Sequence, residues 1–175
     1  MKEKTIKRKW IYKGRIISLR EDKVRLSNGV VSHREIIEHP GAVIIIAVTK
    51  DNKIVMVRQF RKTAEKVLLE IPAGLAHKGE SGINAAKREL QEETGYKAGR
   101  IKFAFKGYSS PGVSTEVMSF YLATQLERAE QNCDHDEMIS VAHYPLKKCL
   151  AMIRSGKITD TKSIAGIMFA NTWKH

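Results

Sequence analysis

Apolar and polar residues alternate along much of the first forty positions, a pattern that is typical of β-strands with one buried face. The three predicted strands are Trp10–Tyr12, Ile16–Val24 and Val30–Ile37. Asn28 and Gly29 lie between the last two, and both residues tolerate the positive φ that a tight hairpin turn requires. A His-Pro-Gly sequence at 39–41 then interrupts the pattern. We therefore expect a small antiparallel β subdomain at residues 1–40.

From residue 41 onward, strand patterns mix with helical ones. Ala42–Thr49 is a nearly continuous apolar run, which indicates a strand that is buried on both faces. Ser81–Thr94 is the strongest helical segment, because Ser81 can cap its start and Gly95 can end it in the left-handed conformation. The other expected elements are strands at Ile54–Phe60, Arg100–Tyr108 and Val117–Ala123 and helices at Pro145–Arg154 and Thr161–Trp173. This order predicts an α/β fold at residues 41–175, a sandwich of helices around a mixed sheet.

The composition is that of a globular protein whose partners carry negative charge. The chain has 175 residues, of which 31 are Lys or Arg and 19 are Asp or Glu, so its formal charge is +12. Such a charge favours nucleic acid, an acidic membrane surface or a phosphorylated small molecule, and it does not choose among them. The longest apolar run, Ala42–Val48, is too short to span a bilayer, so no membrane partner is expected.

Cysteine usage and the start of the chain bear on the cellular compartment. No secretory signal is recognisable behind the first residues. Cys133 and Cys149 show neither metal-site spacing nor a disulfide framework, so we expect idle thiols in a reducing environment. These features together predict a cytoplasmic protein.

Three carboxylates gather on one side of the predicted helix. At about 100° per residue, Glu89 and Glu93 lie almost above one another, and Glu92 flanks them. Like charges at this spacing destabilise a helix, so a compensating cation is expected. Arg88 can supply part of it, and Mg²⁺, which binds through a few carboxylates and shares them with substrate phosphates, can supply the rest. Taken alone, however, such acids more often form a solvated helix face.

The spacing around these acids is far more specific than the acids themselves. The pattern is Gly, five residues, Glu, seven residues, Arg-Glu, an aliphatic residue, any residue, Glu-Glu, any residue, Gly and an apolar residue. Its nine specified positions are Gly74, Glu80, Arg88, Glu89, Leu90, Glu92, Glu93, Gly95 and Tyr96. This pattern resembles the Nudix box, the signature of hydrolases that cleave a nucleoside diphosphate linked to another moiety. The resemblance implies a loop–helix–loop on a Nudix α/β/α sandwich, with Glu89, Glu92 and Glu93 as candidate metal ligands and Glu92 among the catalytic residues.

Flanking residues are similar to those of the ADP-ribose pyrophosphatases within this superfamily. The matching segments are Arg34–Val43, Val57–Arg61, Glu70–Gly74 and Ser109–Val113. Pro111 stands fifteen residues past Tyr96, and its value comes from this distance to the box. In these enzymes the N-terminal β subdomain swaps across a homodimer and completes the adenosine site of the partner. The resemblance therefore implies a homodimer.

The same resemblance assigns roles to individual residues. Those implied in substrate binding are Arg34, Glu35, Arg61, Leu75 and Ser110. Ala73 would lend its carbonyl oxygen to a metal. Arginine forks match phosphate oxygens, so Arg34 and Arg61 could brace the pyrophosphate, but surface ion pairing explains either arginine equally well. The region near Ile16 and Ile17 is aliphatic where many relatives place an aromatic residue against adenine, so the sequence does not predict adenine stacking.

A late loop departs from the pattern of the relatives, which often carry two acids separated by one residue. Glu137 matches the metal-binding acid, whereas His135 occupies the place of the general base. A histidine with a pKa near neutral can accept a proton from water, so the chemistry is compatible with His135. Asp136 and Glu116 are alternatives for the base.

These features predict an enzyme that cleaves ADP-ribose to AMP and ribose 5-phosphate with Mg²⁺ or Mn²⁺. Another nucleoside diphosphate sugar or a dinucleotide is the alternative substrate. A nucleic-acid-binding or regulatory Nudix module is the alternative of a different class, and the charge of +12 allows it. The intact set of acids disfavours that alternative, because a pure binding module has no need of them.

Overall fold

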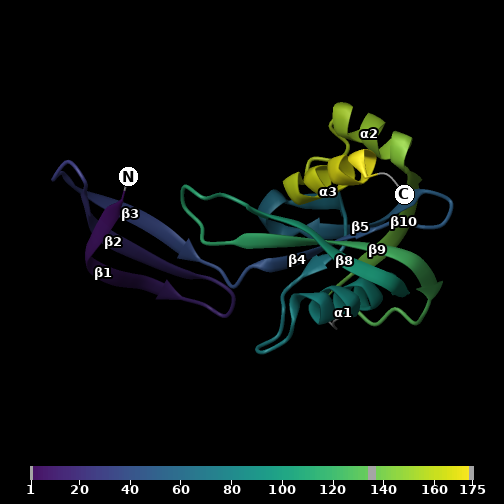
Figure 1. The fold of residues 1–175 in the computed structure, drawn as a ribbon, viewed down its shortest axis with the longest axis horizontal. Coiled ribbons are helices and arrows are strands. Elements are labelled where there is room, and N and C mark those ends of the chain that lie inside the picture. Colours follow the sequence, from purple (N-terminus) through teal and green to yellow (C-terminus); the bar gives the residue numbers. More distant parts are fainter. Residues whose placement is uncertain (1, 134–136, 174–175) are drawn as a thin grey trace. The chain divides into compact units, whose positions relative to one another are not determined.

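The computed structural model describes residues 2–133 and 137–173 (Figure 1). The chain divides into two compact units. The first consists of the segment up to Gly41 together with Gly107–Met118, and the second of Ala42–Lys106 together with the chain from Ser119 onward. The short stretch Gly107–Met118 thus packs with residues that lie seventy positions away, a grouping that hydrophobic patterning did not reveal.

The first unit is built on an antiparallel sheet in the order β1-β2-β3, with strands β1 (Glu3–Lys13), β2 (Ser18–Leu26) and β3 (Val31–Glu38). Gly29 has a φ of 87°, and the backbone N–H of Val30 donates to the Asn28 side chain, so this turn forms as expected. The predicted strand Trp10–Tyr12 is too short: β1 begins seven residues earlier, because its many lysines hide the strand period. Every residue of β1 is exposed.

The second unit contains two sheets and three α-helices. A four-stranded sheet has the order β7-β4-β9-β8, and a three-stranded sheet has the order β10-β5-β6. The strands are β4 (Ala42–Ala47), β5 (Lys53–Arg61), β6 (Lys66–Glu70), β7 (Ala73–Gly74), β8 (Tyr96–Tyr108), β9 (Val117–Arg128) and β10 (Ile139–Pro145). The helices are α1 (Gly82–Thr94), α2 (Leu146–Arg154), α3 (Thr161–Thr172) and the 3-10 turn η1 (Lys62–Ala64).

The core of the second unit lies on both faces of β4. Ile45 packs in a cluster with Ala86 and Leu90 of α1. On the other face, Gly166 lets α3 approach Ile46 so closely that an added Cβ would press on its side chain. Helix α1 lies on one side of the strands and α2 and α3 on the other (Figure 1). The predicted α/β/α sandwich with a mixed sheet is therefore confirmed.

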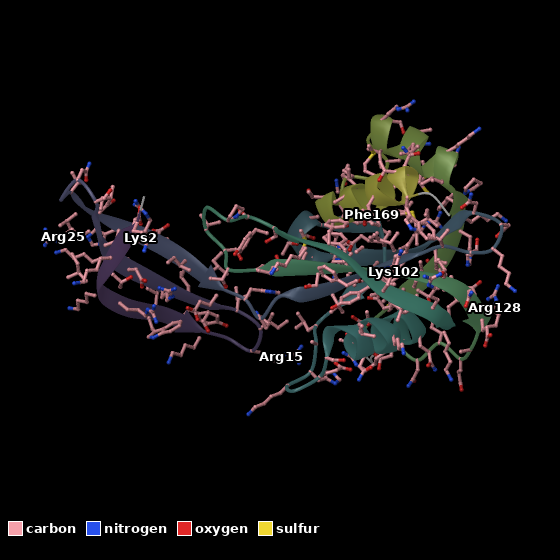
Figure 2. All side chains as sticks on the ribbon, in the orientation of Figure 1. Lys2, Arg15, Arg25, Lys102, Arg128 and Phe169 are labelled. Atoms are coloured by element: carbon pink, nitrogen blue, oxygen red, sulfur yellow. The ribbon has the colours of Figure 1, made fainter. Side chains whose placement is uncertain are left out.

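The positive charge of the chain is spread over both units. Lys2, Arg15 and Arg25 project from the first unit, and Lys102 and Arg128 from the second (Figure 2). None of the helices within residues 2–133 and 137–173 is both long and apolar enough to cross a membrane.

Candidate active site

Helix α1 carries the predicted carboxylates, and capping residues fix where it begins and ends. Its N-cap is Ser81, whose side chain accepts a hydrogen bond from the backbone N–H of Asn84. Its C-cap is Gly95, which has a φ of 65° and donates its N–H to the carbonyl of Gln91. Ala85, Ala86 and Leu90 are fully buried, and this apolar side anchors the helix on the sheet. The helix predicted at Ser81–Thr94 is confirmed.

Arg88 organises the acids of the box. Its guanidinium donates to Glu80 at 3.0 and 3.2 Å, to Glu89 at 2.8 Å and to Glu92 at 2.7 Å. It also donates to the backbone carbonyl of Leu75 at 2.8 Å. The hydrogen bond from Arg88, assisted by the N–H of His77, lowers the pKa of Glu80 to about 2. Arg88 therefore ties the loop before α1 to the acidic side of the helix.

Glu93 is the most deeply buried acid of the box. Its side chain accepts a hydrogen bond from the backbone N–H of Ala73 at 3.1 Å, which joins the helix to β7. The pKa of Glu93 is raised to about 8, chiefly by burial; the charges of Glu89 and Glu137 act in the same direction, and the hydrogen bond from Ala73 and the charge of Arg61 act against it. An ionised carboxylate at this position is therefore unfavourable unless a cation compensates it.

Glu89 explains the first glycine of the box. A Cβ at Gly74 would overlap the Glu89 carboxylate, so only glycine lets β7 pass this close to the helix. Burial raises the pKa of Glu89, and the charges of Glu92 and Glu137 act in the same direction. The charge of Glu137 thus raises the pKa of both Glu89 and Glu93, which indicates that Glu137 lies near them.

The carboxylate oxygens of the box are ligands that suit a hard divalent cation. Among the described residues, no three His, Cys, Asp or Glu side chains converge as a metal-binding group. Arg88 occupies oxygens of Glu89 and Glu92, and the Ala73 N–H occupies Glu93. A buried and a partly buried carboxylate with raised pKa values, Glu93 and Glu89, are nevertheless the kind of oxygen ligand that Mg²⁺ takes. The metal roles of Ala73 and Glu137 stay predictions.

Arg61 lies in a partly buried ionic network around the buried Glu70, and the sequence did not predict this network. It forms a two-pronged ion pair with Glu70, with both N–O distances at 2.8 Å, and Lys162 contacts the same carboxylate. Burial alone would raise the pKa of Glu70, but hydrogen bonds from Arg61 and Lys162 lower it below its ordinary value. Asp160 pairs with Lys162 at 3.0 Å and caps α3. Since Glu70 and Lys162 are far apart in the chain, no local sequence pattern predicts their contact.

Arg34, Glu35 and Ser110 belong to the first unit, whereas the carboxylates belong to the second. Arg34 pairs with Glu3 at 2.6 Å, and Glu35 is exposed on β3. The carbonyl of Ser110 accepts hydrogen bonds from two backbone N–H groups in its own turn. Ion pairing, the alternative left open for Arg34, is thus present in the structure. The substrate roles of these three residues stay predictions.

The structure describes two of the four candidates for the general base, Glu116 and Glu137. His135 and Asp136 lie outside the described residues, so their predicted roles are untested. Glu116 lies in the first unit, 3.7 Å from Nδ1 of His39. Glu137 stands just before β10, which pairs with β5 through Ile139 and Gln59.

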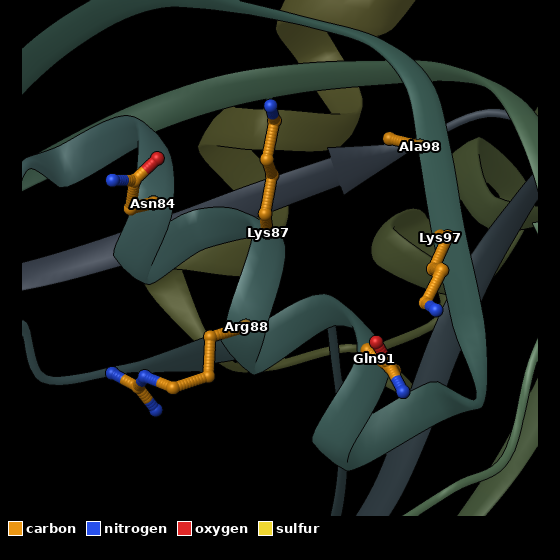
Figure 3. A pocket seen from close by; sticks show the side chains of 6 residues that line it. All are labelled: Asn84, Lys87, Arg88, Gln91, Lys97 and Ala98. Carbon is orange, nitrogen blue, oxygen red and sulfur yellow. The ribbon is translucent and has the colours of Figure 1, made fainter.

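A separate hollow of about 410 Å³ lies between α1 and the start of β8 (Figure 3). It is lined by Asn84, Lys87, Arg88, Gln91, Lys97 and Ala98. None of these residues is a carboxylate, so the hollow is distinct from the acidic side of the helix. Arg88 belongs to both, because it is one of the residues that line the hollow and its guanidinium binds the acids.

Comparison with known proteins agrees with this geometry. Residues 38–162 match the NUDIX domain, and residues 3–37 match the nucleoside diphosphate sugar hydrolase N-terminal domain. The chain is 41% identical to an ADP-ribose pyrophosphatase of Bacillus subtilis (strain 168) over 97% of its own length and 92% of that protein. It is 42% identical to a methanol dehydrogenase activator of Bacillus methanolicus over 95% of its own length and 91% of that protein.

A solved structure adds evidence on the fold. The crystal structure of an ADP compounds hydrolase superposes with a TM-score of 0.88 at 22% identity, covering 99% of this chain and 94% of that one. This similarity extends over the N-terminal sheet as well as the sandwich. The resemblance drawn from the box is thus confirmed: the chain belongs to the Nudix family and carries the N-terminal domain of nucleoside diphosphate sugar hydrolases.

Proposed function

We propose that this chain hydrolyses the pyrophosphate of ADP-ribose to AMP and ribose 5-phosphate. The observation that carries the proposal is the complete Nudix box, in which the buried Glu93 and the partly buried Glu89 both have raised pKa values. The Bacillus subtilis relative, an ADP-ribose pyrophosphatase, supports the choice of substrate. The description of the N-terminal domain supports the broader class of nucleoside diphosphate sugars as the alternative.

In the reaction, an oxygen of water bonds to one phosphorus while the bond from that phosphorus to the bridging oxygen breaks. The bridging oxygen leaves with the other phosphate, and the proton of the water passes to a base. Glu89, Glu93, Glu137 and the Ala73 carbonyl would hold Mg²⁺ or Mn²⁺. When bound, such an ion neutralises pyrophosphate charge and makes water easier to deprotonate. Arg88 would keep the acids in register throughout.

The general base is proposed to be His135. Its position in the sequence matches the base of relatives, and an imidazole can accept a proton near neutral pH. Asp136, Glu116 and a more direct role for Glu137 are the alternatives.

Substrate recognition is proposed to involve arginine forks. Arg34 and Arg61 would bind phosphate oxygens, and Glu35, Leu75 and Ser110 would contact the rest of the nucleotide. In the structure, both arginines pair with carboxylates of the chain itself, Arg34 with Glu3 and Arg61 with Glu70. Substrate phosphates would therefore compete with those carboxylates or add to them.

We further propose that two copies form a homodimer through the N-terminal sheet. Ile6, Trp10, Ile11 and Tyr12 of β1 are between 39% and 57% exposed. A three-stranded sheet with apolar side chains in solvent is stabilised by packing on a second surface. A second copy of the chain supplies that surface.

We also propose a cytoplasmic location, where the free cysteines Cys133 and Cys149 would stay reduced.

The decisive experiment is an assay of nucleoside diphosphate derivatives with Mg²⁺, with products separated by chromatography. AMP and ribose 5-phosphate from ADP-ribose are the expected products. Faster turnover of another nucleoside diphosphate sugar or a dinucleotide would move the assignment to that substrate. RNA binding with a steep salt dependence, without metal-dependent hydrolysis, would instead favour a binding module.

A further inference from the structure

The carbonyl end of α1 is closed by a distant segment of the chain. The last carbonyls of a helix have no partners within the helix and need others. Here the segment Ala129–Cys133, which follows β9, supplies them. The side-chain amide of Gln131 donates to the carbonyl of Glu93 at 2.7 Å, and the backbone N–H of Asn132 donates to the carbonyl of Glu92 at 3.2 Å. The backbone N–H of Ala129 donates to the carbonyl of Gly95 at 2.8 Å.

Gln131 and Cys133 extend these contacts into a short network. The Gln131 amide also donates to Sγ of Cys133 at 3.3 Å, and the Cys133 thiol donates to the carbonyl of Glu92 at 3.3 Å. Both amide protons of Gln131 are therefore used. Two of the three carbonyls that the segment binds belong to Glu92 and Glu93, the paired acids of the box.

The second glycine of the box makes room for this segment. Gly95 has a φ of 65°, which glycine adopts without strain. A Cβ on Gly95 would also lie 3.1 Å from the carbonyl oxygen of Ala129 and 3.3 Å from the backbone nitrogen of Gln131. Glycine at this position therefore ends the helix and also admits the segment.

The same segment leads to Glu137. Four positions separate Cys133 from Glu137, and β10 begins two residues later. Strand β10 is itself tied to the end of the box, because the Tyr96 hydroxyl lies 3.0 Å from Nε2 of His143. Glu137 thus lies, along the chain, between two attachments to the same end of α1, one through Ala129–Cys133 and one through His143 of β10.

We propose that Ala129–Cys133 is a docking segment that sets the position of Glu137 relative to the box carboxylates, with Gln131 as its positioning residue. The inference rests on the proposed function, in which Glu137 completes the metal site. It adds that the geometry of this site depends on a side chain that touches neither metal nor substrate.

The test is a double-mutant cycle between Gln131→Met and Glu137→Gln. Methionine keeps the length of the side chain and removes both donors. On the parent background, we expect Gln131→Met to lower kcat by about 10- to 100-fold, the effect of a small misplacement of an active group, with little change in KM. On the Glu137→Gln background, the same substitution should change kcat by less than about 2-fold, because the residue through which it acts is gone.

Equilibrium binding of Mn²⁺ to the protein without substrate, followed by electron paramagnetic resonance, gives a second readout. Gln131→Met should weaken it about 10-fold on the parent background and leave it unchanged on the Glu137→Gln background. Cys133→Ala, a milder change in the same network, should act in the same direction. Asn84→Ala is the matched control, since this exposed amide on the first turn of α1 forms no side-chain hydrogen bond with a described residue.

Equal losses on both backgrounds would show that Gln131 serves folding alone and would overturn the inference. Wild-type kcat and Mn²⁺ binding in a folded Gln131→Met protein would do the same. Failure of the proposed function looks different: the parent would hydrolyse no nucleoside diphosphate, while the coupling in Mn²⁺ binding would still appear. A parent that neither hydrolyses substrate nor binds Mn²⁺ would overturn both.

Discussion

Replacing Glu93 by Gln should make the metal-free protein more stable and the enzyme almost inactive. Glu93 is buried, with a pKa of about 8 against an ordinary 4.5. The folded chain therefore holds a proton on Glu93 that the unfolded chain has lost at neutral pH. Because folding must bind this proton from neutral solution, Glu93 lowers the free energy of unfolding by up to about 3 kcal/mol at pH 7. Gln carries no charge and can still accept the hydrogen bond from Ala73.

The raised pKa of Glu93 determines the pH range over which the substitution changes stability. For an acid whose pKa is higher in the folded chain, its contribution to stability is complete below the unfolded pKa and is lost as pH rises. The stability difference between Glu93→Gln and the parent should thus be near zero at pH 4.5, grow through pH 7 and level off above pH 8. Turnover with Mg²⁺ should fall about 10³-fold if Glu93 is, as proposed, a charged ligand of the metal.

Urea unfolding in the presence of a chelator, at pH 5 and at pH 8, measures the stability difference. Steady-state hydrolysis with Mg²⁺ measures the turnover. Glu127→Gln, which changes an exposed carboxylate on β9, is the matched control and should alter neither property. Near-normal turnover in purified Glu93→Gln would refute the metal role. A stability difference of the same size at pH 5 and pH 8 would refute the electrostatic argument.

Three further predictions concern the rest of the site. Gly74→Ala should lower kcat by about 10- to 100-fold and raise the Mg²⁺ concentration needed for half-maximal rate, because the added Cβ displaces the Glu89 carboxylate. An unchanged Mg²⁺ titration would contradict this prediction. His135→Gln should flatten the acidic limb of the pH–rate profile and cut the rate by about 10²- to 10⁴-fold, whereas His135→Glu should stay active. If His135→Gln is fully active and Glu137→Gln is inactive, the general base is Glu137 instead. Sedimentation should show a homodimer that Trp10→Glu dissociates, and a fully active monomer would exclude the dimer.

The parts of the fold that the sequence predicted well are those specified by local rules. Helix α1 begins and ends within a residue of the prediction, because Ser81 and Gly95 each satisfy orphan backbone groups at its ends. Strand β4 was predicted from its apolar run alone, since burial on both faces leaves no polar positions. The acids of the box lie on one side of α1 because helical periodicity fixes that relation.

The parts that the sequence did not predict depend on contacts between distant residues. Strands β6 and β7 are short and carry no clear period, so only their pairing with β5 and β4 defines them. The ion pairs of Glu70 join residues from β6 and α3, whose separation in the chain hides them. Docking of Gln131 on the carbonyl of Glu93 is likewise invisible in the pattern, because an exposed glutamine in a polar loop has no distinguishing neighbours.

The glycines and the arginine of the box serve one purpose, which is to hold charged groups where charge is unfavourable. Gly74 lets β7 approach Glu89, and Gly95 lets the segment at 129–133 approach the carbonyl end of the helix. Arg88 neutralises part of the acidic cluster, since its donors are spread over Glu80, Glu89, Glu92 and a backbone carbonyl. Glu89 and Glu93 keep raised pKa values in these surroundings, so a divalent cation that compensated their charge would bind favourably. Under the proposed function, we therefore expect the strength of metal binding to depend on the residues that crowd the carboxylates as well as on the carboxylates themselves.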